Sequence, residues 1–232
     1  LTMIFTSLKA SVGNYLVSKK DEEQIKLFNL LEVYNYWLVA FCSICFIVLI
    51  PDFINICFGE QYILSLPVLI WAVLNFYTSN IRQALWTYRE TMGVFKKTKY
   101  TTIVTAIINI ELSILLAKFF GLSGVIAATV IARMIYAWWK EPLVIYKDYF
   151  KTSPMPYFIT YIKRVVLLFA MSGITYIVAI IIPVPNIYIN FLLKGIVCII
   201  VPVIIFFIIY RKSEAYIYIT NNLIKRKVKN IG

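Results

Sequence analysis

The sequence contains no histidine, and only 15% of its 232 residues are charged. Histidine is the most common general base and a frequent zinc ligand, so its absence argues against both kinds of site. Cys42 and Cys45 form a C-x-x-C pair inside an apolar run. Because no second pair of ligands accompanies them, we interpret them as small buried hydrophobes rather than a metal or redox site. We therefore expect neither a metal nor another cofactor.

Hydrophobic residues, by contrast, make up 61% of the chain, and the mean hydropathy is +0.82. Soluble domains are nearer half apolar. The runs 33–51, 61–81 and 165–193 contain no Asp, Glu, Lys or Arg, and a membrane-crossing helix needs about 20 mostly apolar residues. A transmembrane β-barrel would show short alternating segments instead. The composition therefore predicts an all-α, polytopic transmembrane helix bundle.

The apolar runs and turn residues predict six complete spans after a partial helix at the start of the chain. Glycine in FFGLSG (119–124) permits a short connection, and proline in PVPN (183–186) favours a tight turn. Because the first residues resemble the end of a longer helix, we expect a fragment of a larger protein. The expected spans are 33–50, 62–90, 98–118, 121–140, 159–182 and 187–210. The expected parts are a four-span portion with the partial helix (1–141), a cytoplasmic linker (142–158), a two-span hairpin (159–210) and a basic tail (211–232).

A net charge of +12 would favour nucleic acid as the partner of a soluble protein. Here the basic residues occupy alternate connections between spans, so we expect no nucleic-acid partner. By the positive-inside rule, the side that carries them is cytoplasmic, and the C-terminus lies on that side. The opposite side carries only Lys118. The residues that define the basic side are Lys19, Lys20, Lys26, Lys96, Lys97, Lys99, Lys140, Lys147, Lys151, Lys163, Arg164, Arg211, Lys212, Lys225, Arg226, Lys227 and Lys229.

Polar residues follow one face of the predicted span 62–90. At about 3.6 residues per turn, their positions fall on one helix face that runs from mid-membrane toward the cytoplasmic edge. Guanidinium groups suit phosphate because their planar fork donates two hydrogen bonds to paired oxygens. The alternative is that Arg82 and Arg89 only extend to the membrane interface; the deeper Arg82 favours the binding interpretation. The face consists of Asn75, Thr78, Ser79, Arg82, Trp86 and Arg89.

Glu111 lies on an apolar face of the predicted span 98–118, where a carboxylate is expected to be protonated or paired. Arg133 on the next span is the nearest basic residue of the same hairpin. The sequence favours a structural ion pair between the two, with a proton- or ion-coupling role for Glu111 as the alternative. Arg133 is also a candidate for a polar cavity that binds the substrate, as are Asn109, Lys9 on the partial helix, and Lys194 in the sixth span.

Several motifs, taken in order, carry a resemblance to a known family. They are ASVGN (10–14), IPDFINICFGEQYIL (50–64), the R-x-x-x-G-x-F-K pattern of Arg89, Gly93, Phe95 and Lys96, KYTTIVTAIINIELS (99–113) and FGLSGVIAATVIAR (120–133). In order and spacing the chain resembles the bacterial polysaccharide and O-antigen flippases of the multidrug/oligosaccharidyl-lipid/polysaccharide exporter superfamily. Many relatives have Gly-Thr where this chain has Ala128-Thr129. The resemblance covers residues 7–150 well, and the last two spans only in pattern.

The resemblance implies two six-helix lobes around a central cavity, with this chain as the second lobe plus two added helices. The missing N-terminal lobe would belong to the same polypeptide. The implied substrate is an oligosaccharide on a polyprenyl diphosphate, moved by alternating access from the cytoplasmic to the outer leaflet of the bacterial inner membrane, for surface polysaccharide synthesis. The implied partners are this lipid-linked oligosaccharide and membrane lipids. A transporter, not an enzyme, is expected.

Two other functions are compatible with the sequence. A multidrug or cation antiporter of the same superfamily would favour acidic over basic cavity residues. A membrane-embedded glycan polymerase or glycosyltransferase would need catalytic carboxylates in its loops. The longest predicted outer loop, residues 51–62, has only Asp52 and Glu60, so no catalytic constellation is visible there.

Overall fold

The computed structural model describes residues 2–18, 21–93, 98–181, 184–213 and 216–218, and all regular structure in these residues is helical. The predicted all-α class is therefore confirmed for this part of the chain. Lys19, Lys20, Phe95, Lys96, Lys97 and most of the predicted basic tail lie outside the described residues. The elements are α1 (Thr2–Ser18), α2 (Asp21–Phe58), the 3₁₀ turn η1 (Glu60–Tyr62), α3 (Leu66–Asn80), α4 (Gln83–Thr91), α5 (Thr101–Ala132), the π-helical η2 (Arg133–Ala137), α6 (Trp138–Val144), the π-helical η3 (Ile145–Tyr149), α7 (Met155–Ile181) and α8 (Ile187–Tyr210).

Four helical segments are long and apolar enough to cross a membrane. They are Glu22–Phe58, Thr101–Tyr149, Met155–Ile181 and Ile187–Tyr210. Their length and composition agree with the prediction of a membrane protein with transmembrane helices, whereas six complete spans are not found among the described residues. The difference has two sources: α3 is only 15 residues long, and residues 101–149 form one continuous helical stretch.

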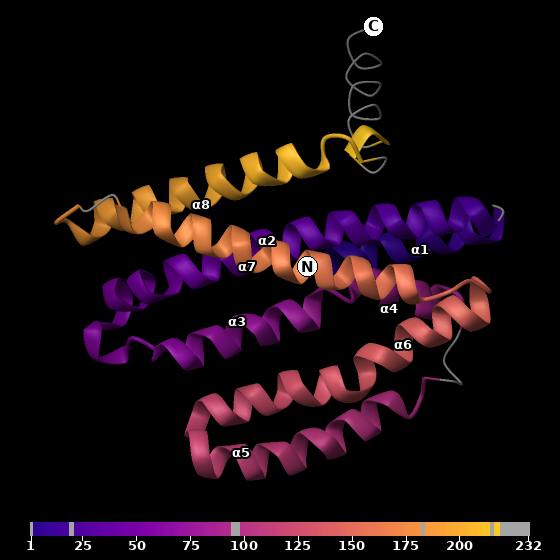
Figure 1. The fold of residues 1–232 in the computed structure, drawn as a ribbon, viewed down its shortest axis with the longest axis horizontal. Helices are drawn as coiled ribbons and strands as arrows, with labels where there is room; N and C mark the ends of the chain where they lie inside the picture. The colour runs from indigo at the N-terminus through magenta and orange to yellow at the C-terminus, as the bar shows by residue number, and fades with distance from the viewer. Residues whose placement is uncertain (1, 19–20, 94–97, 182–183, 214–215, 219–232) are drawn as a thin grey trace, which may run out of the picture.

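That continuous stretch reverses direction at Gly121, as Figure 1 shows for α5. Gly121 has φ 56° and ψ −134°, a conformation outside the helix that glycine adopts at low cost. The two limbs then approach closely, because a Cβ placed on Gly124 would lie 2.2 Å from the carbonyl oxygen of Leu116. Residues 101–120 and 122–149 therefore form a tight helical hairpin at the position of the predicted FFGLSG connection.

The predicted linker at 142–158 is shorter than expected. Pro142 lies inside α6, and the helix continues through η3 to Tyr149, so only residues 150–154 separate it from α7. Proline removes one backbone donor, but the Ile145 amide donates to the carbonyl of Glu141 and carries the helix past it. Burial explains the continuation, since Ile145, Tyr146 and other residues after the proline pack in the core.

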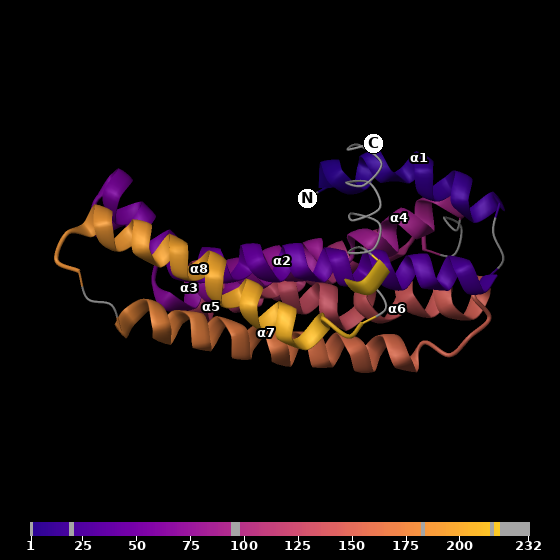
Figure 2. The same cartoon turned by 90° about the horizontal axis from the view of Figure 1, so that it is seen from above.

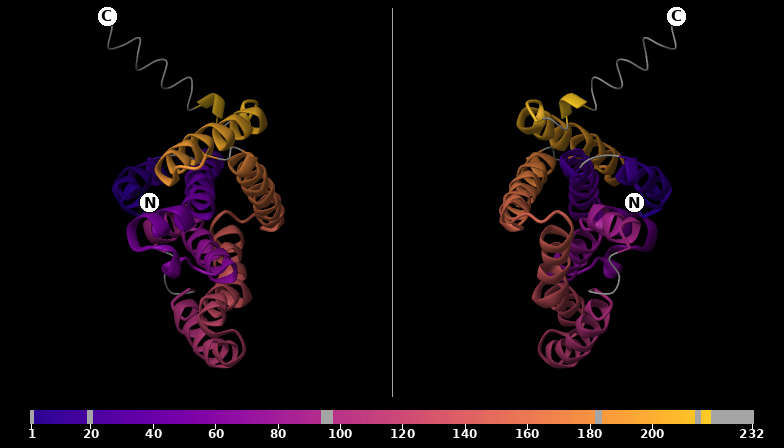
Figure 3. Two further views of the ribbon diagram at one scale, coloured as in Figure 1. Left: turned by 90° about the vertical axis from the view of Figure 1, so that its left-hand side faces the viewer. Right: turned by 90° about the vertical axis from the view of Figure 1, so that its right-hand side faces the viewer.

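The long helices lie side by side, with α8 at one edge of the molecule and the α5 hairpin at the other (Figure 1). The end views in Figure 3 show most of them nearly along their axes. Helix α2 lies centrally and contacts α3, α4, α7 and α8, whereas α3 packs on α5. Helix α1 packs on α4 and lies to one side of the bundle, as Figure 2 shows.

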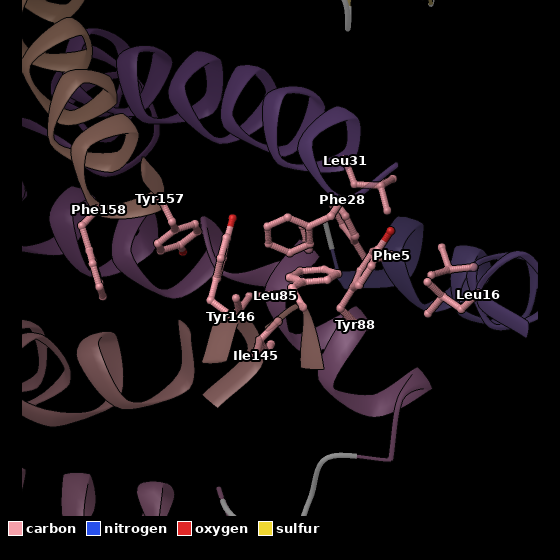
Figure 4. Packing of buried hydrophobic residues seen from close by; sticks show 13 residues of the cluster. Phe5, Leu16, Phe28, Leu31, Leu85, Tyr88, Ile145, Tyr146, Tyr157 and Phe158 are labelled. Atoms are coloured by element: carbon pink, nitrogen blue, oxygen red, sulfur yellow. The ribbon is translucent and has the colours of Figure 1, made fainter. Parts of the chain in front are cut away.

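An aromatic cluster joins α1, α2, α4, η3 and α7 at the end of the bundle where α4 ends (Figure 4). The rings of Phe28 and Tyr88 meet edge to face with centroids 4.9 Å apart, and Phe28 and Tyr146 meet at 6.0 Å. The Tyr88 hydroxyl also donates to the carbonyl of Gln24 at 2.9 Å. Such contacts fix the far end of α4, which carries Trp86 and Arg89 of the polar face predicted from the sequence.

Candidate functional site

A break in the helix precedes the first arginine of the predicted polar face. Ile81 and Arg82 form a turn between α3 and α4, and Arg82 has φ −94° and ψ 5°. The side-chain amide of Asn35 on α2 donates to the carbonyls of Asn80 at 3.0 Å and Ile81 at 2.8 Å. Asn35 is fully buried. The two backbone carbonyls at the break in the helix thus accept hydrogen bonds from a protein side chain, as an apolar environment requires.

The polar face continues across this break and meets a single neighbour, the segment from η2 to α6. Arg133 binds Asn75 and Thr78 on α3, whereas Glu141 binds Arg82 in the turn and Trp86 and Arg89 on α4. The segment that carries the polar face and the segment from η2 to α6 therefore lie side by side and run in the same direction. Five of the six residues predicted to share a face do so in the structure. The sixth, Ser79, is half-buried and makes no hydrogen bond that the described residues record.

Glu141 is the centre of the α4 half of this face. Arg82 Nη2 and Trp86 Nε1 donate to its Oε2, the latter at 2.9 Å, and Arg89 Nη1 donates to its Oε1 at 3.1 Å. Arg82 and Glu141 are each 3% exposed. The Arg82 guanidinium also lies 5.2 Å from the ring centroid of Trp86, within cation–π range. One carboxylate thus receives donors from three successive side chains of the face.

Arg133 is held by neutral groups alone. Its Nη1 donates to Thr78 Oγ1 at 2.6 Å and to Asn75 Oδ1 at 3.2 Å, and its Nη2 donates to the same amide oxygen at 3.1 Å. Within the described part of the chain Arg133 makes no ion pair. The ion pair predicted between Glu111 and Arg133 is therefore not formed, because the amide and hydroxyl of α3 take the guanidinium instead.

The π-helical turn η2 explains why Arg133 and Glu141 reach the same neighbour. Eight residues of regular α-helix rotate a side chain by about 800°, which leaves it roughly 80° from its starting direction. A π turn accommodates about one extra residue, so the offset falls to roughly 20°. The turn at 133–137 therefore brings the base and the acid onto one side of the helix.

Cations outnumber anions in this arginine cluster, which we define as Arg82, Arg89, Arg133 and Glu141. Two guanidinium groups pair with the one carboxylate, and the third, that of Arg133, binds only neutral groups among the described residues. The Nε atoms of Arg82 and Arg89 are buried and have no hydrogen-bond partner. The cluster thus has unused donors and excess positive charge between apolar helices, and it can attract and bind an anion.

The other predicted site residues lie outside the cluster. Lys9 on α1 forms an ion pair with Glu90 on α4, one residue after Arg89. Asn109 accepts a hydrogen bond from Ser113 at 3.2 Å within α5. Lys194 on α8 pairs with Asp52 on α2 at 2.6 Å. Glu111 is exposed on α5 without an ion pair to any described residue.

Sequence reasoning missed three residues that organise the buried charges: Glu141, Glu32 and Arg164. Glu32 and Arg164 form a second buried ion pair, between α2 and α7. The predicted spans began at residue 33 and ended at residue 140, so these acids fell one residue outside them. A search for acids at the ends of apolar runs, facing arginines, would have found both.

No family model, curated protein or solved structure matches this chain. Function is therefore inferred from the arginine cluster, together with the resemblance carried by the motifs.

Proposed function

We propose that this chain is part of a membrane transporter that moves an oligosaccharide linked to polyprenyl diphosphate from the cytoplasmic to the outer leaflet. The observation that carries the proposal is the arginine cluster, in which Arg82 and Arg89 share the single carboxylate of Glu141 and Arg133 has no carboxylate among its described partners. The motifs in residues 7–150 that resemble polysaccharide flippases point to the same substrate class.

The chemistry of the cluster suits a diphosphate. An anionic headgroup cannot cross hydrocarbon unaided, because a charge at the centre of a bilayer is costly. Guanidinium groups donate to paired phosphate oxygens in a fixed geometry. Unpaired positive charge among buried helices is itself unfavourable, so an anion that neutralises it gains affinity from the environment as well as from hydrogen bonds.

We further propose six membrane crossings. They are α2, α3 with α4 as one broken crossing, the two limbs of 101–149, α7 and α8. Broken crossings occur in transporters where irregular backbone lies next to a substrate site. The basic connections would place residues 92–100 and 150–154 in the cytoplasm of a bacterial cell. In this proposal, a first lobe of the same polypeptide completes the cavity around the cluster.

Transport by the polypeptide that carries this chain tests the proposal. It would be reconstituted into sealed vesicles with a lipid-linked oligosaccharide, and the fraction of sugar accessible to an impermeant glycosidase would be followed with time. We expect Arg82→Gln and Arg133→Gln to slow transfer about tenfold or more, the effect of losing one charged hydrogen bond. Lys163→Gln, an exposed base on α7, is the matched control. Unchanged transfer in both arginine variants would refute the proposal.

A cation antiporter is a second candidate, because of one observation. Glu111 is an exposed carboxylate on a largely apolar limb of α5, and no described residue pairs with it. An acid in such a place is a candidate for carrying a proton or cation. In that case Glu111→Gln would abolish efflux of a cationic dye from vesicles, whereas the flippase proposal expects no dye transport by either protein.

A further inference from the structure

Glu141 is held as a bound anion would be held. Both of its oxygens accept, and the three donors are the side chains of Arg82 at the N-cap of α4 and of Trp86 and Arg89 on α4. The other buried acid, Glu32, differs in this respect. It has one partner, Arg164, at 2.7 Å, and its second oxygen has none. Glu32 makes an ordinary ion pair, whereas Glu141 occupies an anion site.

The donors around Glu141 exceed what a carboxylate can use. Each guanidinium carries five N–H groups, and the Nε atoms of Arg82 and Arg89 are buried without an acceptor. Arg82 is 3% exposed, so water does not readily replace the missing partner. A diphosphate has more acceptor oxygens than a carboxylate, and it can therefore bind donors that Glu141 leaves unused.

The Glu141 carboxylate and a diphosphate cannot accept hydrogen bonds from the same donors at the same time, because two negative charges in contact repel strongly in a site that excludes water. We infer that Glu141 is an internal competitor for the anion site: its side chain holds Arg82, Trp86 and Arg89 until the diphosphate of an incoming substrate takes them over. The inference rests on the proposed function, and it adds how the site is kept occupied between substrates.

Exchange of the two anions has a structural consequence. Glu141 belongs to α6, whereas its donors lie on α4 and on Arg82 in the turn that separates α4 from α3. When the diphosphate takes the donors, the ionic link between α4 and α6 opens. Substrate binding and helix separation are then coupled, since the ligand binds better to the state in which the two helices are parted.

Binding of geranyl diphosphate, a short isoprenyl diphosphate, to the detergent-solubilised protein tests the inference by calorimetry. We expect Glu141→Gln to bind this probe about tenfold more tightly than the wild type, since the competing charge is gone. Glu32→Gln is the matched control, because it neutralises the other buried acid that pairs with arginine, and its affinity should equal that of the wild type. Geraniol, which lacks the diphosphate, is the control for partition of the apolar chain into the detergent micelle.

Thermal unfolding supplies an independent readout. Glu141→Gln should lower the midpoint in the absence of anion, and geranyl diphosphate should raise it more than in the wild type, because the probe replaces the lost carboxylate. Glu32→Gln should also lose stability, but the probe should not restore it.

If Glu141→Gln does not fold, Glu141→Asp serves instead. Its charge is kept but its side chain is one methylene shorter, and several-fold tighter binding of geranyl diphosphate than in the wild type is expected.

The outcomes separate the inference from the proposed function. If wild type and both Glu141 variants bind the probe equally, while Arg82→Gln does not bind it, the competition is refuted and the anion site remains. If no protein binds geranyl diphosphate better than geraniol, the arginine cluster is not a diphosphate site, and the inference and the proposed function both fall.

Discussion

Arg164 on α7 and Glu32 on α2 form an ion pair of 2.7 Å inside the helix bundle. The guanidinium also lies 5.5 Å from the ring centroid of Tyr36, whose hydroxyl donates to the carbonyl of Arg164 at 3.0 Å. This group ties α7, and α8 packed against it, to the central helix α2. Its position differs from the sequence-based assignment, which placed Arg164 among the basic residues of a cytoplasmic connection.

Removing one partner of this pair should destabilise the protein more than removing both. Glu32→Leu or Arg164→Leu leaves a buried charge uncompensated and should cost about 3–5 kcal/mol of unfolding free energy. The double variant should cost less than either single variant. Chemical unfolding in detergent micelles measures the three free energies, and additive losses would show that the pair is not coupled.

Asn35 should be necessary for the broken helix between α3 and α4. Asn35→Leu removes the donor that binds the carbonyls of Asn80 and Ile81, and leaving buried acceptors unpaired costs about 1–3 kcal/mol. We expect faster amide exchange around α4 as well as lower stability. Asn29→Leu, on an exposed position of the same helix, is the control. Equal behaviour of the two variants would contradict the assigned role of Asn35.

Lys194 should act in stability rather than in binding anions. It pairs with Asp52 at 2.6 Å, with both side chains about one-fifth exposed. Asp52→Lys and Lys194→Asp should each destabilise the contact of α2 with α8, and the double exchange should recover about 1 kcal/mol of coupling. Thermal unfolding of the four proteins measures this coupling. A double variant as unstable as the sum of the single variants would argue against the pair.

The proposed crossings can be tested by labelling. In a protein whose native cysteines are replaced, Leu122→Cys at the α5 reversal and Thr152→Cys before α7 should react with an impermeant maleimide from opposite sides of sealed vesicles. Both positions are exposed in the structure. Thr152→Cys and Gly93→Cys should react from the same side. Labelling of residues 122 and 152 from one side would mean that the hairpin does not cross the membrane.

Periodicity was sufficient to predict the polar face from Asn75 to Arg89. A helix repeat aligns those positions whatever packs against them, and the turn at Arg82 does not disturb the alignment. The partner of the face could not be found in the same way. Glu141 directly follows the predicted span 121–140 and precedes Pro142, so it was placed outside the spans although the helix continues to Tyr149.

The pairing of Glu111 with Arg133 was predicted from depth in the hairpin alone. The depth of a residue in the membrane does not determine the direction in which its side chain points. The Arg133 side chain points toward a helix outside the hairpin, because Asn75 and Thr78 on α3 supply its acceptors. The tertiary contact of α3 with the hairpin decides the outcome, and no local pattern in residues 98–140 encodes that contact. The helical class, the reversal near Gly121 and the polar face are local properties, and these were predictable.

The π-helical turn at residues 133–137 makes the arginine cluster sensitive to the direction of a change in chain length. Deletion of one residue within 134–137 can be absorbed by the π turn becoming regular helix, because seven regular residues carry about 700° and leave the same offset of roughly 20° between Arg133 and Glu141. Insertion of one residue there adds about 100° and turns the carboxylate away from α4. Every charged residue of the cluster would still be encoded in both cases, yet only the insertion would separate Glu141 from its donors.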